Sequence, residues 1–198
     1  MITVKTTKTD KTRKLVLSAI LTALVVVLQL MGSFIRFGKF SVSLVLVPIV
    51  IGIATCGTGI GAWLGLVFGV AVLVSGDAAT FLAIDPIGTV ITVIVKGVLC
   101  GLIAGLVYKL FEKKNRYLAV VSSAIVCPIV NTGVFLLGCV IFFLPSISEW
   151  AVANDYGTNI AKYMIFMLVG GNFIFEMLTN ILLSPIIVRL LNIRKKSL

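Results

Sequence analysis

The sequence predicts an all-α membrane protein whose six transmembrane helices form one compact bundle over residues 15–191, with both termini in the cytoplasm. Of its 198 residues, 60% are hydrophobic and 12% are charged, whereas a soluble domain has roughly 25% charged residues. A chain of this length cannot bury so much apolar surface in its own core, because small domains keep much of their surface exposed. The apolar residues also form six runs, and most basic residues lie at the ends of these runs.

The first half of the chain contains three predicted spans. A helix needs about 20 apolar residues to cross roughly 30 Å of hydrocarbon. A basic tail, residues 1–14, precedes the first span at residues 15–35. The second span, residues 42–56, is short and contains Pro48. A glycine-rich turn separates it from the third span at residues 60–75.

The second half contains three longer runs. The fourth span covers residues 87–111 and the fifth covers residues 118–144. A polar loop, residues 146–159, leads to the sixth span at residues 160–191. The chain ends in a second basic tail, residues 192–198.

The distribution of positive charge predicts the orientation of the bundle, because cytoplasmic loops carry an excess of lysine and arginine. With an even number of spans, both tails and the loop after the fourth span lie on the same side. The basic residues in and around these segments are Lys5, Lys8, Lys11, Arg13, Lys14, Lys109, Lys113, Lys114, Arg116, Arg189, Arg194, Lys195 and Lys196. We therefore assign this side to the cytoplasm, and the net charge of +10 to membrane topology rather than to nucleic-acid binding.

Small residues recur at every fourth position in three of the spans. This spacing places them on one helix face, and in a membrane it lets two backbones approach closely. The two glycine rows are Gly61, Gly65 and Gly69 in the third span and Gly97, Gly101 and Gly105 in the fourth. We expect both rows to pack within the bundle. The pair Ala19 and Ala23 in the first span either packs in the same way or docks onto another membrane protein.

Ionisable side chains inside membrane spans are costly and usually functional. Lys96 lies in the fourth span and Glu176 in the sixth. Asn172 and Asn180 lie on the same helix face as Glu176, and Asn131 lies in the fifth span. In one interpretation Lys96 pairs with Glu176 while the asparagines tie helices together. In the other, these residues line a substrate-binding pocket, with the lysine facing an anionic group. The two interpretations are compatible.

The pocket is expected in the outer half of the bundle, where loops between the spans would cover it. Asp77 and Asp85 bracket a loop-like segment with Phe81 between them, and this segment is interpreted as a gate. Arg36, which follows the first span, and Trp150, in the loop before the sixth span, are further candidates for the gate or rim.

Several classes of function lack their motifs. The sequence has no phosphate-binding glycine loop, which argues against an ATPase, and no catalytic constellation of a known hydrolase, which argues against an enzyme. It has no histidine, and its four cysteines lack metal-site spacing, so no metal and no cofactor are expected. A stand-alone secondary transporter or channel is an alternative hypothesis, and a membrane enzyme or assembly factor is another.

Four stretches together resemble the substrate-binding S component of an energy-coupling factor (ECF) transporter. They are residues 14–23 with their alanine pair, residues 60–69, residues 127–131 and residues 172–180. The resemblance covers residues 14–191 and rests on the order of these four stretches along the chain.

The resemblance implies a fold, a location and partners. It implies a multi-pass protein of the bacterial plasma membrane that binds a vitamin or related micronutrient near the outer face. The group it resembles includes riboflavin, folate and pantothenate binders, and the substrate stays open. Such a component docks onto a membrane T component coupled to two cytosolic ATPases, which hydrolyse the ATP, and it is thought to tilt in the membrane to release its substrate inside. Ala19 and Ala23 match the docking motif of the family.

Overall fold

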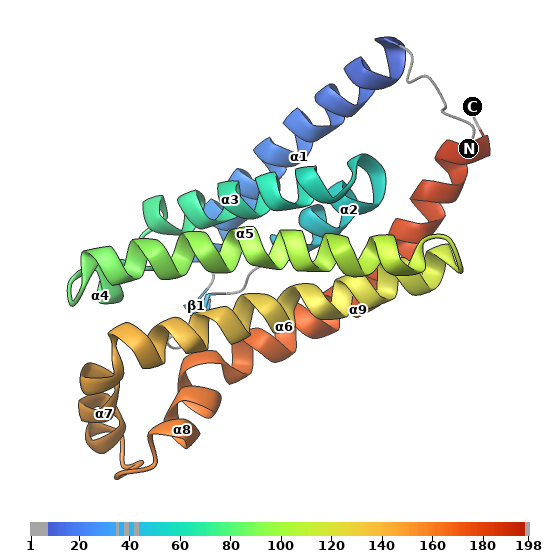
Figure 1. The fold of residues 1–198 in the computed structure, drawn as a ribbon. Helices are drawn as coiled ribbons and strands as arrows, with labels where there is room; N and C mark the ends of the chain where they lie inside the picture. Colours follow the sequence, from blue (N-terminus) through green and yellow to red (C-terminus); the bar gives the residue numbers. More distant parts are fainter. Residues whose placement is uncertain (1–7, 35, 38–39, 42–43, 197–198) are drawn as a thin grey trace.

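The structure is a computed structural model that describes residues 8–34, 36–37, 40–41 and 44–196. Helices dominate it, and two-residue strands form one short antiparallel pair. The elements are α1 (Lys8–Phe34), β1 (Arg36–Phe37), β2 (Phe40–Ser41), α2 (Leu46–Cys56), α3 (Thr58–Val74), α4 (Ala79–Leu82), α5 (Pro86–Phe111), α6 (Arg116–Phe142), α7 (Leu144–Ala153), α8 (Ile160–Tyr163), the π-helix η1 (Met164–Val169) and α9 (Gly170–Lys196) (Figure 1).

Four of the described helical segments are long and apolar enough to cross a bilayer. They are Lys11–Ser33, Pro86–Phe111, Arg116–Phe142 and Ile160–Arg189. The apolar helices α2 and α3 are shorter, with 11 and 17 residues. At a rise of about 1.5 Å per residue, α2 is roughly 16 Å long, which is about half of the hydrocarbon thickness.

Three predicted boundaries differ from the structure. Residues 8–14, assigned to a tail, continue α1, because lysine, arginine and threonine do not stop a helix. The predicted loop at residues 146–159 contains most of α7, whose Ile147 and Ala151 are buried in the bundle. The predicted sixth span is not one regular helix, since η1 interrupts it between α8 and α9.

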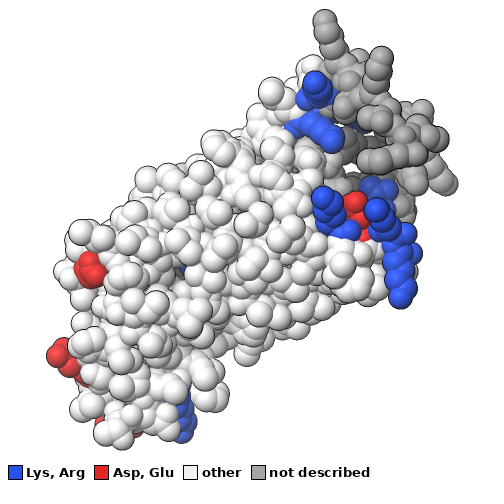
Figure 2. Space-filling view, viewed as in Figure 1, with Lys and Arg blue, Asp and Glu red and all other residues white. Residues whose placement is uncertain are grey.

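The arrangement of the helices places charge at the two ends of the molecule. Figure 1 shows the first described turn of α1, the α5–α6 connection and the end of α9 at one end, with α4 and α7 at the other. In Figure 2 lysine and arginine gather at the first end, and the broad middle of the visible face carries almost no charge. Large apolar side chains such as Leu15, Ile87, Leu110 and Leu182 are mostly exposed in the structure. Such a surface fits a surrounding of lipid rather than water.

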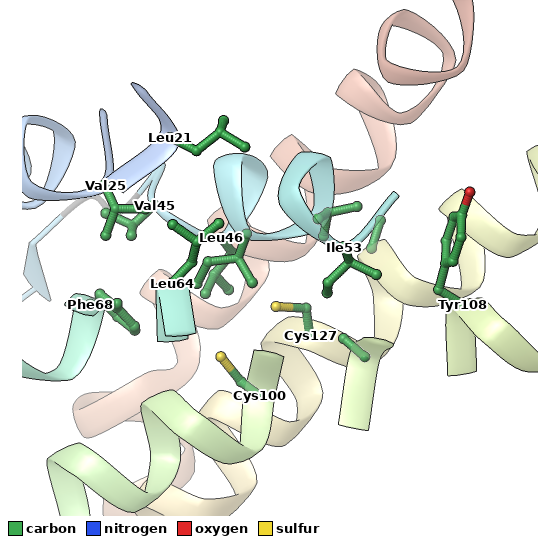
Figure 3. Packing of buried hydrophobic residues seen from close by; sticks show 14 of the residues in the cluster. Leu21, Val25, Val45, Leu46, Ile53, Leu64, Phe68, Cys100, Tyr108 and Cys127 are labelled. Carbon is green, nitrogen blue, oxygen red and sulfur yellow. The ribbon is translucent and has the colours of Figure 1, made fainter. Parts of the chain in front are cut away.

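The core lies between α1, α2, α3, α5, α6 and α9. Figure 3 shows Leu46 and Ile53 of α2 beside Leu64 of α3, with Cys100 of α5 and Cys127 of α6 next to them. A second cluster, which includes Phe143, Ile147 and Tyr163, joins the end of α6 to α7 and α8. The two apolar clusters therefore fix the positions of the helices around the interior space of the bundle.

The glycine rows pack within the bundle, as the sequence predicted. A Cβ atom added to Gly65 would overlap the carbonyl group of Gly97, and one added to Gly101 would overlap the carbonyl of Gly61. The backbones of α3 and α5 therefore touch, as small-residue rows allow. The turn between α2 and α3 depends on another glycine, Gly57, whose φ of +104° is strained for any residue with a side chain.

Asp85 caps α5. Its side chain accepts a hydrogen bond from the Gly88 amide at 3.0 Å, and Pro86 occupies the first turn of the helix. Losing such a cap costs about 1 kcal/mol. We therefore expect Asp85→Ala to lower the free energy of unfolding by about that amount, and Asp85→Asn to restore most of it. Urea or thermal unfolding in detergent measures this. Weaker ligand binding at unchanged stability would instead place Asp85 at a binding site.

Candidate functional site

A cavity of about 170 Å³ lies between α1, α3, α5, α6 and the last span. This is more than ten times the room, about 10–15 Å³, that a single buried water needs. The polar side chains that line it are Gln29, Asp77, Thr89, Thr92, Lys96, Asn131, Thr132, Asn172 and Glu176. They come from the end of α1, the connection between α3 and α4, the first half of α5, the second half of α6 and the first half to middle of the last span. The cavity is therefore in the half of the bundle that lies away from the basic end.

The centre of the polar wall is the buried carboxylate of Glu176, which is 1% exposed. Asn172, one turn earlier in α9, donates from Nδ2 to Oε1 at 3.0 Å. Asn131 of α6 donates from Nδ2 to Oε2 at 3.4 Å. Each carboxylate oxygen therefore receives one amide, and the pair of helices α6 and α9 holds the group in place. Asn131 follows Pro128, an interior proline of α6.

Lys96 of α5 extends into the same cavity. Its Nζ lies 5.5 Å from the centre of the Phe68 ring and 5.2 Å from that of Phe135. At these distances the electron-rich ring faces attract an ammonium group. Among the described residues no direct ion pair joins Lys96 to Glu176. The sequence left two interpretations of these residues, a polar pocket and a Lys96–Glu176 ion pair. The absence of a direct contact between the two charged groups favours the pocket.

Aromatic side chains form another part of the wall. Phe81 of α4 lines the cavity and lies edge-on to Phe135, Phe143 and Trp150, with ring centres 5.6, 5.0 and 5.8 Å apart. Such edge-to-face pairs are the preferred geometry of aromatic rings. Trp150 supports Phe81 from α7 and does not line the cavity. The arrangement joins α4 to α6 and α7 over one side of the cavity.

A polar contact ties the end of α1 to the segment after α3. Gln29 donates from Nε2 to Oδ2 of Asp77 at 2.5 Å and to Oγ of Ser75 at 3.3 Å. Gln29 and Asp77 both line the cavity. The segment interpreted as a gate is therefore attached to the first helix through side chains that face the candidate ligand.

The structure brings some of the sequence-predicted site residues together and separates others. Those that line the cavity are Lys96, Asn131, Asn172, Glu176, Asp77 and Phe81. Asn180 lies outside the lining, where its Nδ2 donates to the backbone oxygen of Glu176 at 2.9 Å. Asp85 also lies outside it and caps α5. Arg36 begins β1, and its side chain lies outside the described part of the chain.

Sequence reasoning missed Gln29, Thr89, Thr92 and Thr132 as polar cavity residues. Gln29 carried a readable signal, since it is an isolated amide within an apolar run. The threonines carried none, because a threonine in a helix can donate its hydroxyl to a carbonyl one turn back, as Thr89 does to Asp85 at 2.7 Å. The structure shows that the Thr92 hydroxyl makes no hydrogen bond among the described residues.

Ala19 and Ala23 lie on an exposed face of α1. Their neighbours Leu15, Val16 and Ile20 are also exposed and apolar. The two alanines therefore do not pack within the described bundle. This leaves the docking interpretation in place for α1, while the similar glycine rows of α3 and α5 serve internal packing.

The chain was compared with protein families, with curated proteins and with solved structures. The model of the family described as ECF transporter, substrate-specific component, matches residues 13–191. No curated protein and no solved structure matched.

Proposed function

The chain belongs to the family of substrate-specific components of ECF transporters, and from this premise we propose that its cavity captures a vitamin or a related micronutrient outside the cell. The chain would then deliver the ligand to the inside when it is docked onto a T component that is coupled to two ATPases. ATP hydrolysis takes place in those partners, so the chain itself is not an enzyme. It acts in the bacterial plasma membrane.

One observation carries the proposal. A cavity in one half of the bundle is lined both by Lys96 and Glu176, which are charged residues far from the ends of their spans, and by aromatic rings. Ligand sites combine an apolar wall with a few placed polar groups in this way. Intramembrane charges that served packing alone would pair with each other, whereas Lys96 faces two rings and Glu176 receives two amides.

The proposed topology has six crossings. They are α1, α2, α3, α5, α6 and the last span formed by α8, η1 and α9. The basic residues Lys109, Lys113 and Lys114 lie at or just after the end of α5, and the positive-inside rule places that end in the cytoplasm. Both termini would then be cytoplasmic, and the cavity would lie toward the outer face.

Lys96 and Asn172 supply the test at the site. Ligand that copurifies with the detergent-solubilised chain is identified by mass spectrometry, and its dissociation constant is measured by calorimetry. We expect Lys96→Ala and Asn172→Ala each to weaken binding tenfold or more, which corresponds to about 1.4 kcal/mol. Each removes a group that faces the ligand.

Two matched variants control for the substitutions themselves. Lys109→Ala changes a lysine in the last turn of the same helix, and Asn115→Ala changes an asparagine that caps α6 at the basic end. Neither residue lines the cavity, so ligand affinity should stay within twofold. Wild-type affinity in both Lys96→Ala and Asn172→Ala would reject the assignment of the cavity as the binding site.

A further inference from the structure

The orientation of two asparagines in the cavity restricts what the ligand can be. A carboxylate can only accept hydrogen bonds, so Glu176 attracts the Nδ2 groups of both Asn131 and Asn172. The amide oxygen of each side chain is then turned away from the carboxylate. Glu176 thus acts as a positioning residue, because it presents two amide oxygens as acceptors.

These acceptors have no partner of their own. The Oδ1 atoms of Asn131 and Asn172 and the Oγ1 atom of Thr92 are buried and make no hydrogen bond among the described residues. Asn131 and Thr92 are each only 4% exposed, and all three residues line the cavity. Native proteins satisfy most buried polar atoms. The two amide oxygens can only accept a hydrogen bond, and the Thr92 hydroxyl can accept or donate one. The unpartnered amide oxygens therefore indicate a ligand that donates hydrogen bonds.

Lys96 has the opposite requirement. An ammonium group has three donors and no acceptor, and contact with the rings of Phe68 and Phe135 attracts its charge without offering an oxygen or nitrogen lone pair. Glu176 attracts the ammonium group through the cavity but makes no direct ion pair with it among the described residues. A carboxylate on the ligand would satisfy Lys96.

The remaining wall favours a flat apolar body. Phe68, Phe81, Phe135 and Phe143 line the cavity, and aromatic faces pack well against planar rings. A ligand with several negative charges is disfavoured, because Lys96 is the one basic side chain of the described lining and can neutralise a single carboxylate.

We propose that the cavity selects a small amphoteric ring compound, whose N–H groups donate within the set of oxygens formed by Asn131, Asn172 and Thr92 and whose one carboxylate meets Lys96. This inference rests on the proposed function, because it names the substrate class of the same site. It narrows the sequence-based expectation of an anionic ligand. A compound with the charge alone would leave the three oxygens unsatisfied.

A matched set of probes tests the substrate class on the full chain in detergent after the copurified ligand has been washed out. The first probe, 4-aminobenzoate, has the ring, the N–H donors and the carboxylate. In 4-(dimethylamino)benzoate both donors are capped, and aniline lacks the carboxylate. We expect calorimetry or ligand-detected NMR to show that 4-aminobenzoate binds at least tenfold more tightly than either of the others, because a site built around a donor discriminates strongly against analogues that lack it.

Substitutions of Asn131 and Thr92 test whether their oxygens cause the preference for 4-aminobenzoate over its dimethylated analogue. Asn131→Leu removes an acceptor together with the Nδ2 donor to Glu176, and Thr92→Val removes a hydroxyl alone. Both substitutions nearly keep the shape of the side chain. Each should bring the affinity ratio of 4-aminobenzoate to its dimethylated analogue towards one without weakening the analogue. Thr92→Val keeps the test open where Asn131→Leu fails to fold. Ser123→Ala is the control, since it removes an unpartnered buried hydroxyl outside the cavity, and it should leave the ratio unchanged.

Two results would overturn the inference. One is equal binding of 4-aminobenzoate and its dimethylated analogue, or binding of none of the probes. The other is an unchanged ratio in the folded Asn131→Leu and Thr92→Val variants. Either result leaves the proposed function standing if a copurified ligand still binds in a manner that depends on Lys96. Loss of that dependence would reject the proposed function itself.

Discussion

Gly65→Leu is expected to abolish folded protein, because the backbone of α3 lies directly on the backbone of α5 at this position. Even a Cβ atom at Gly65 would overlap the carbonyl group of Gly97. Backbone cannot move aside as a flexible side chain can, so the two helices would have to separate. We expect Gly65→Ala to cost about 1–3 kcal/mol, which is typical of overpacking, and Gly65→Leu to cost more than the bundle can lose.

Gly59 provides the matched control for this prediction. It lies in the first turn of the same helix, is exposed, and has no neighbouring atom within 4 Å of an added Cβ. Gly59→Ala should therefore keep or slightly raise the unfolding temperature, because alanine favours a helix over glycine. The measurement is thermal unfolding in detergent, together with the yield of monodisperse protein. A folded Gly65→Leu protein of wild-type stability would show that the two helices do not touch as described.

The double variant Ala19→Trp, Ala23→Trp is expected to lose ATP-dependent uptake while it still binds ligand. Both alanines are exposed on α1 and do not line the cavity. Large side chains there leave the bundle intact but prevent the close helix approach that small residues allow in membranes. Uptake into liposomes that contain the complete transporter and co-purification with the T component should both be lost, and ligand affinity should stay within twofold.

Ala161→Trp is the control, since it places the same side chain on an exposed alanine in α8, at the start of the last span. It should leave uptake and assembly unchanged. Wild-type assembly of the double variant would mean that docking uses another surface. Loss of ligand binding along with uptake would mean that the tryptophans disturb the bundle, and the docking interpretation of this face would fail.

Much of the fold and the family could be predicted because the relevant signals are local or periodic. Gly61, Gly65 and Gly69 recur at helical spacing, and the structure confirms that they pack within the bundle. The ordered stretches that resemble ECF S components are confirmed by the family match over residues 13–191. Lys96 and Glu176 stood out because charged residues are rare in membrane spans.

The rest depends on contacts between distant parts of the chain. Nothing near Lys96 indicates that Phe68 and Phe135 will flank its ammonium group, since these rings come from α3 and α6. The π-helix has no sequence signature that separates it from the α-helices on either side. Asp85 was assigned to the gate, although an aspartate directly before Pro86 is the signal of a helix start, and the structure shows that it caps α5.

The account depends on the chain being the substrate-binding part of an ATP-driven importer, and liposome uptake tests this most directly. The ligand identified by mass spectrometry is offered to liposomes that contain the chain alone, and to liposomes that also contain a T component and both ATPases. We predict uptake only in the complete system with ATP, and its loss in the Lys96→Ala variant. Uptake by the chain alone, driven by an ion gradient without ATP, would contradict the account and identify a secondary transporter.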